Sequence, residues 1–183
     1  SHFKRDSQML QLGITPTENT TIAGTYERSR AKVAYADRMM DGSKFDRDAW
    51  NVRFTQRNLT PWFSELELRY GESEIDHVMD TYSLRTIRNP AGKQIKNANN
   101  PKRNTDTGRL KATFDWDNLN LQTGVDYMDD VHVARMERGG DGYSHKPYMP
   151  NQSFKQWGVF TEAAWQQTDK QRWVAGLRHD RVK

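Results

Sequence analysis

The 183-residue chain contains no cysteine, so it can form neither a disulfide framework nor a thiolate metal site. No stretch approaches the roughly 20 consecutive apolar residues that a membrane-spanning helix needs. Hydrophobic residues make up only 34% of the chain and its mean hydropathy is −1.02, which is low for a soluble globular core of this size. These absences argue against a transmembrane helix and against a disulfide-stabilised domain.

Blocks of like charge and catalytic motifs are also missing. Lys and Arg number 28 against 24 Asp and Glu, and the cations are scattered apart from Lys102-Arg103, so we expect no nucleic-acid partner. The chain has no Gly-x-Ser-x-Gly, P-loop or dinucleotide-binding fingerprint. A triad of Ser73, Asp76 and His77 is disfavoured, because in a strand Asp76 points away from the other two. The chain is therefore not expected to be an enzyme.

What the chain does have is a two-residue alternation of apolar and polar side chains that restarts along its length. Successive side chains of a strand point to opposite faces, so each run has one apolar and one polar face. Short turns and long polar loops alternate between the runs, which is typical of an outer-membrane β-barrel with lipid outside and a polar lumen inside. The apolar positions of three runs are Leu66, Leu68 and Tyr70; Leu110, Ala112, Phe114 and Trp116; and Trp157, Val159, Thr161, Ala163 and Trp165.

The pattern predicts an all-β antiparallel meander of about eight strands over residues 1–183, in contact with outer-membrane lipid. The last residues still follow a strand pattern, so we expect a piece of a longer protein and an arc of a large transmembrane barrel. Aromatic residues beside the short turns, Trp62, Phe63, Trp116, Trp165 and Trp173, suit an interfacial girdle. The predicted strands are Ser7–Thr15, Thr20–Ala36, Asp48–Asn58, Ser64–Arg85, Gly108–Asp117, Leu119–Arg135, Lys155–Gln166 and Gln171–Arg181, and the predicted long loops are 37–47, 86–107 and 137–154.

The sharpest candidate site is the pair His77 and Met79. Their positions differ by two, so both side chains point the same way, and their parity is opposite to that of Leu66, which predicts that they face the lumen. His77 lies about 16 residues past the turn at Pro61, on the order of 40 Å above the periplasmic rim at ~3.3 Å per residue and a tilt of about 40°. An imidazole nitrogen beside a thioether sulfur is a soft pair that favours copper.

A second group of soft ligands has the same predicted orientation. Met128, His132 and Met136 occupy even positions, opposite Val125 and Tyr127, so they are predicted to face the lumen. Their strand is expected to lie about 10 Å from that of His77 and Met79, so that all five side chains line one track. Met39-Met40 and His145–Met149 add soft ligands in the loops. The alternative is that each Met only fills a packing gap.

Asp76–Arg85 resembles a barrel-wall segment of the TonB-dependent outer-membrane copper receptors, and Gly124–Tyr127 fits the same family. The resemblance implies the family's norm of about 22 strands, a bacterial outer-membrane location, copper as the transported ligand, and energy from an inner-membrane TonB complex acting through a plug domain. In that family a His-x-Met of the barrel meets a Cys and a Met of the plug to hold copper. The His-x-Met carries over to His77 and Met79; the chain has no cysteine, and we expect the plug to be absent from it.

Three alternatives remain open at this point. A TonB-dependent receptor for another metal chelate or a siderophore is favoured by clusters of Arg and aromatic residues in the loops. A soluble β-sheet binding protein predicts that the face carrying Leu66, Leu68 and Tyr70 packs on a second sheet. An outer-membrane hydrolase needs a Ser and a His on one face near the rim.

Overall fold

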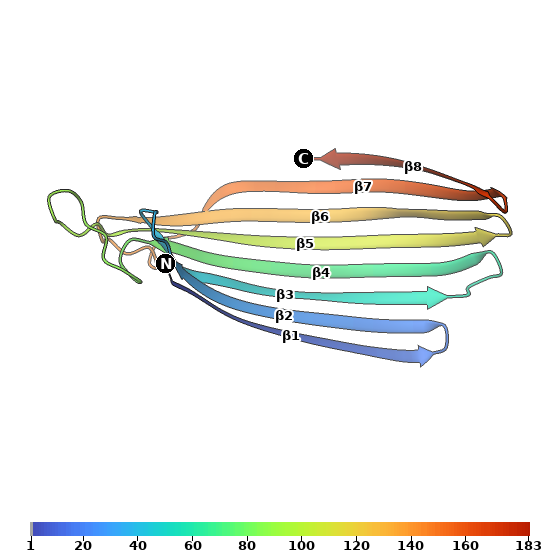
Figure 1. Ribbon diagram of the computed structural model, residues 1–183, viewed down its shortest axis with the longest axis horizontal. Helices are drawn as coiled ribbons and strands as arrows, with labels where there is room; N and C mark the ends of the chain where they lie inside the picture. The colour runs from blue at the N-terminus through green and yellow to red at the C-terminus, as the bar shows by residue number, and fades with distance from the viewer. Residues whose placement is uncertain (1) are drawn as a thin grey trace.

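The computed structural model describes residues 2–183 as one open antiparallel sheet of eight strands, in which each strand pairs with its neighbours along the chain (Figure 1). Short turns join the strands at one end of the sheet, and longer loops project at the other (Figure 1). The predicted all-β meander is confirmed, and its two outermost strands are left as edges among the described residues. The strands are β1 (His2–Thr17), β2 (Thr20–Ala34), β3 (Asp41–Arg57), β4 (Phe63–Asp80), β5 (Asn97–Trp116), β6 (Leu119–Arg138), β7 (Met149–Thr168) and β8 (Gln171–Val182).

The strands extend farther toward the long loops than the sequence predicts. β3, β5 and β7 begin well before their predicted starts, so the predicted loops 37–47, 86–107 and 137–154 shrink to 35–40, 81–96 and 139–148. Here the pairing is supported by charged side chains instead of apolar ones: Lys102 lies 3.0 Å from Glu74, and Arg103 lies 2.7 Å from Asp130. An analysis based on apolar alternation cannot detect strands of this kind.

β4, in contrast, ends earlier than predicted, at Asp80 instead of Arg85. The Asp80 carboxylate accepts hydrogen bonds from the backbone N–H groups of Tyr82 and Ser83 at 3.0 and 2.7 Å. An Asp side chain that binds its own backbone in this way initiates a turn and competes with continued strand pairing.

The strand register gathers the predicted apolar positions on one face of the sheet. Leu68 and Leu110 on this apolar face are 50% and 46% exposed, and no second sheet covers it within residues 2–183. The soluble-sheet alternative required such a layer. The same residues contain no helix that is long and apolar enough to cross a membrane. One unbroken row of the apolar face consists of Ile14, Ile22, Phe54, Leu68, Leu110, Val125 and Val159.

Aromatic residues mark two levels on the apolar face. Beside the short turns, the rings of Trp62, Phe63, Phe114 and Trp116 form a lower aromatic cluster with centroids 4.8–6.5 Å apart. The predicted Trp165 and Trp173 pair with each other on the same face. Nearer the long loops an upper tyrosine row follows, and each of its hydroxyl groups donates to a carboxylate: Tyr26 to Asp48, Tyr70 to Asp106, and Tyr127 to Asp129.

The two aromatic levels are separated by the thickness of a membrane's apolar band. Leu119, which pairs with Trp116, is eight residues from Tyr127. At ~3.3 Å per residue and a tilt of about 40°, this separation is roughly 20 Å, against about 25 Å for the apolar band of an outer-membrane barrel. Aromatic rings with polar tips belong at such a boundary. The strands continue beyond the upper tyrosine row, and the candidate site lies there.

Candidate metal site

The polar face opposite the apolar one is called the inner face below. Arg69, Arg109 and Asp126 lie on it in one row across β4, β5 and β6. The register between β4 and β5 has no shift from Glu65 to Asp80. Every odd-numbered residue in this part of β4 therefore shares the inner face with Arg69.

His77 and Met79 both lie on the inner face, as the alternation predicts. His77 is seven residues beyond Tyr70, which at ~3.3 Å per residue and a tilt of about 40° places it roughly 18 Å above the upper tyrosine row. The pair is therefore at the outer end of the wall, in agreement with the height inferred from the sequence.

The His77 ring is held by an aromatic neighbour that sequence reasoning missed. Phe45 pairs with His77 across the β3–β4 ladder, and the two rings stack with centroids 4.7 Å apart and planes 17° apart. A β-bulge between Gly42 and Lys44 shifts the register here, so the phase of β3 cannot be read from alternation alone. Gly42 leaves the space that the Phe45 ring fills, because a Cβ on Gly42 would lie 1.9 Å from that ring.

The structure brings Met136 and His132 near the pair but not into contact with it. Met79, Asn99 and Met136 form one row across β4, β5 and β6, so Met79 and Met136 are two interstrand spacings apart, about 10 Å. His132 is on the inner face two same-face positions below Met136, in the row of Arg103. Nδ1 of its ring lies 2.8 Å from the amide nitrogen of Asn151, which occupies a bulge in β7. Because an amide nitrogen only donates, Nδ1 accepts this hydrogen bond, which fixes the ring and places the proton of the neutral imidazole on Nε2.

Met128 is on the predicted face but at a different height. It pairs with Thr107, near the upper tyrosine row, and lines a cavity of about 350 Å³ with Arg109 and Arg178. The five predicted side chains thus do not form one compact cluster: four lie at the outer end and Met128 lies below them. Parity specifies the face of a strand and says nothing about height.

The start of β7 adds one further soft ligand on this side. Met149 pairs with Ala134 and is 63% exposed. Together with Met136, Asn99 and Asn151 it lines a cleft of about 670 Å³. The Oδ1 atom of Asn99 is buried there without a hydrogen-bond partner. Among residues 2–183 no three His, Cys, Asp or Glu side chains converge as a metal site.

The loop between β4 and β5 is fastened to the end of β6. The Tyr82 hydroxyl donates to the Glu137 carboxylate at 2.8 Å, and burial together with this carboxylate raises the pKa of Tyr82 well above its usual value. Thr81 donates from its hydroxyl to the Ile95 carbonyl at 2.6 Å. The loop base next to the site is therefore held by neutral hydroxyl donors.

Comparisons with known proteins agree with this architecture. The family model described as "TonB dependent receptor-like, beta-barrel" matches residues 2–183. The solved structure of the copper transporter OprC is similar to the chain, with a TM-score of 0.90 and 32% sequence identity over 98% of this chain and 29% of that protein. The chain thus spans less than a third of that protein's length. No curated protein sequence matches the chain. The family and the solved structure are receptors and transporters, not enzymes.

Proposed function

Because the chain belongs to the TonB-dependent receptor β-barrel family, we propose that it forms part of the wall of a bacterial outer-membrane receptor for copper, with His77 and Met79 as metal ligands. The observation that carries the proposal is the placement of this soft pair on the inner face, above the upper tyrosine row. The similar structure is itself titled a copper transporter.

The chemistry of the pair suits copper better than other metals. Imidazole and thioether together select a soft or borderline ion, whereas a hard cation would require carboxylates and structural zinc would require more His or Cys ligands. Two ligands leave the coordination incomplete. The remaining ligands would come from a plug domain in the lumen, which would also couple the receptor to the inner-membrane TonB complex.

The second group acts as secondary contacts along the inner face. His132 and Met136 lie within about two interstrand spacings of the pair, and Met128 is farther toward the periplasmic side. Met136 and Met149 line the cleft beside the loop 139–148, in the rows of Met79 and His77, so they are available to a copper ion that reaches this part of the inner face. Each of these side chains offers copper a single soft atom, whereas the pair offers two next to each other. Each therefore binds copper more weakly than the pair does.

A metal chelate or siderophore is the less favoured ligand. An anionic chelate would need free cations on the inner face. The arginines of the inner cavity are already paired with carboxylates: Arg69 lies 2.9 Å from Glu67, and Arg178 lies 2.6 Å from Asp126 and 2.7 Å from Asp180. Their charge is neutralised within the wall, which leaves the soft pair as the better candidate.

The test is the copper content and affinity of the intact receptor, purified with copper, for the parent, His77→Ala and Met79→Ala. Matched controls are His179→Ala, on the apolar face of β8, and Met9→Ala, on the inner face of β1. We expect both site variants to lose affinity while both controls retain it. Equal stoichiometry and affinity in all five proteins would remove the pair from the function.

A further inference from the structure

The backbone ladders near His77 are irregular on both sides. On the β3 side His77 still pairs with Phe45, and the bulge at Ser43 shifts the register just beyond it, between Val78 and Met79. On the β5 side, partners are lost between the pairs Asp76–Lys102 and Met79–Asn99, where the register places Pro101 opposite His77. Proline has no N–H and is normally confined to edge strands, to strand ends or to bulges, but β5 has neighbours on both sides. The main-chain pairing of the His77 segment with β5 is therefore weakened.

The missing N–H leaves the His77 carbonyl without its ladder donor. The Thr81 N–H donates to the Asn97 carbonyl at 3.1 Å, so the odd-numbered residues of β4 and β5 direct their backbone polar groups at each other. The same alternation directs the carbonyl of His77 at Pro101. A carbonyl that loses both its ladder donor and access to water destabilises the fold, so a replacement donor is expected.

The replacement donor is the side chain of Asn100. Its Nδ2 donates to the His77 carbonyl at 2.9 Å and to the Asp76 carboxylate at 2.7 Å. Its Oδ1 accepts from Arg135 at 2.8 Å and from Tyr148 at 2.9 Å. The residue is only 1% exposed, and this arrangement uses both of its donors and both of its acceptor positions.

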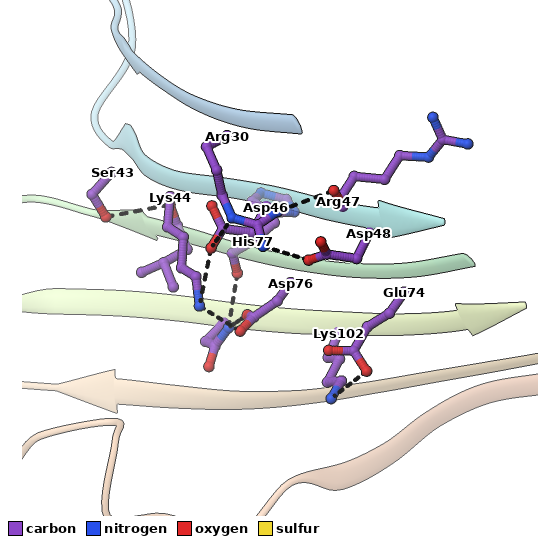
Figure 2. A network of polar contacts seen from close by, with 12 residues as sticks. Arg30, Ser43, Lys44, Asp46, Arg47, Asp48, Glu74, Asp76, His77 and Lys102 are labelled. Atoms are coloured by element: carbon purple, nitrogen blue, oxygen red, sulfur yellow. Dashed lines mark hydrogen bonds and ion pairs between the residues drawn. The ribbon is translucent and has the colours of Figure 1, made fainter. Parts of the chain in front are cut away.

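The Asn100–Asp76 contact is extended to β3 by a partly exposed ion pair on the face opposite the His77 ring. Lys44 lies 2.6 Å from Asp76, and Figure 2 shows its side chain reaching over β4 to that carboxylate, between Asp46 and Lys102. Lys44 directly follows the bulge of β3. Side chains on one face thus connect the strands at the point where the ladders on both sides of β4 are irregular.

We propose that Asn100 is a positioning residue for the copper site: its amide replaces the donor that Pro101 lacks and fixes the His77 backbone from the opposite face of the sheet. The inference rests on the proposed function. A metal site needs its ligands held within about 0.5 Å of the productive geometry. Side-chain support of this kind provides that precision where the strand ladder does not.

A double-mutant cycle tests the exchange of donors. Copper affinity of the intact receptor is measured for the parent, Asn100→Ala, Pro101→Ala and the double variant. Loss of an outer-shell partner typically weakens metal binding about tenfold or more, and we expect this for Asn100→Ala. Replacing Pro101 by alanine supplies a backbone N–H opposite His77, so Asn100→Ala should have little effect in that background. Equal weakening in both backgrounds would overturn the proposal.

Two further variants separate positioning from general damage. Tyr148→Phe removes one partner of Asn100 Oδ1 and leaves the contact with His77 intact, so it should retain copper affinity. If Asn100→Ala is not recovered folded, Asn100→Asp takes its place, because a carboxylate keeps the acceptor for Arg135 and Tyr148 but has no donor. We expect Asn100→Asp to lose affinity, and parental affinity in it would contradict the proposal.

A copper-independent measurement distinguishes failure of this inference from failure of the proposed function. Amide hydrogen exchange of the peptide covering residues 76–80 should accelerate in Asn100→Ala and return toward the parental rate in the double variant. Unchanged exchange would refute the role of Asn100 even if His77 binds copper. Conversely, if His77→Ala retains copper affinity, the proposed function fails, and the exchange rates alone decide whether Asn100 holds the strand.

Discussion

β4 and β6 both present His and Met on the inner face, yet the backbones that carry them differ. β6 keeps an unshifted ladder with β5 from Leu119 to Arg138, and only its ladder with β7 is shifted, at Asn151 beside His132. On β4, His77 lies between a bulge and a proline, beneath a stacked phenylalanine. Regular strand geometry is enough to orient a side chain. A metal site also requires neighbouring contacts that restrict the movement of the ligand side chain. The difference favours β4 as the primary site and β6 as a secondary one.

The largest expected effect is on the two histidines. We expect His77→Ala to weaken copper binding by about 100-fold or more, since loss of a ligand should cost at least as much as loss of an outer-shell partner. His132→Ala should cost less than about tenfold on the same scale. Competition with a copper-specific chelator measures both affinities in intact receptor. A larger loss for His132→Ala would reverse the assignment of the two strands.

The two methionines of one row provide the next comparison. Met79 and Met136 lie on either side of Asn99. Met79 has a histidine two positions away on its own strand, whereas Met136 does not. Met79→Ala should weaken copper binding by about tenfold, whereas Met136→Ala should slow copper uptake at low concentration and change the equilibrium affinity little. Equilibrium binding and uptake rates are measured on the same variants. An equal loss of affinity in the two variants, or no loss in either, would contradict the assignment of Met79 alone as the direct ligand.

The support of the His77 ring provides a third comparison. In Gly42→Ala the added methyl group would meet the Phe45 ring at 1.9 Å, so the ring must leave His77. In Gly13→Ala the nearest atom would be 3.8 Å away, and that variant is the matched control. We expect copper affinity to fall by several-fold, up to about tenfold, only in Gly42→Ala. Parental affinity in Gly42→Ala would show that the stacked ring does not contribute to the site.

The smallest effect is expected at Asn151. Removal of its amide in Asn151→Ala releases Nδ1 of His132, but His132 is a secondary contact. Copper affinity should change less than about threefold, well below the effect of a partner of a primary ligand. Isothermal titration of the intact receptor resolves such a difference, and a loss comparable to that of Asn100→Ala would indicate that β6 carries a primary ligand.

Much of the fold follows from alternation and turn chemistry. The shared face of His77 and Met79 was predictable, because β4 has no shift against β5 from Glu65 onward. The height of Met128 along its strand was not predictable, because every second residue of a strand has the same parity. Neither was the neighbourhood of Phe45, since one inserted residue at Ser43 changes which β3 side chains face inward.

The role of Asn100 illustrates what local sequence cannot reveal. An Asn-Asn-Pro stretch is typical of a loop and fits the loop that the sequence predicts over residues 86–107. The structure instead places Asn100 and Pro101 inside β5. Proline is tolerated there because the side-chain amide of the preceding residue, Asn100, supplies the missing donor. The oxygen of that amide accepts hydrogen bonds from Arg135 on β6 and from Tyr148 in the following loop. These partners are distant in sequence, so only the folded sheet shows them.

X-ray absorption spectroscopy at the copper edge, on intact receptor loaded with copper, tests the central claim most directly. The account predicts imidazole nitrogen and sulfur scattering around the metal in the parent and in His132→Ala. In His77→Ala the sulfur contribution should remain and the imidazole contribution should be lost. An unchanged imidazole signal in His77→Ala, or its loss in His132→Ala, would contradict the assignment of the copper site to β4.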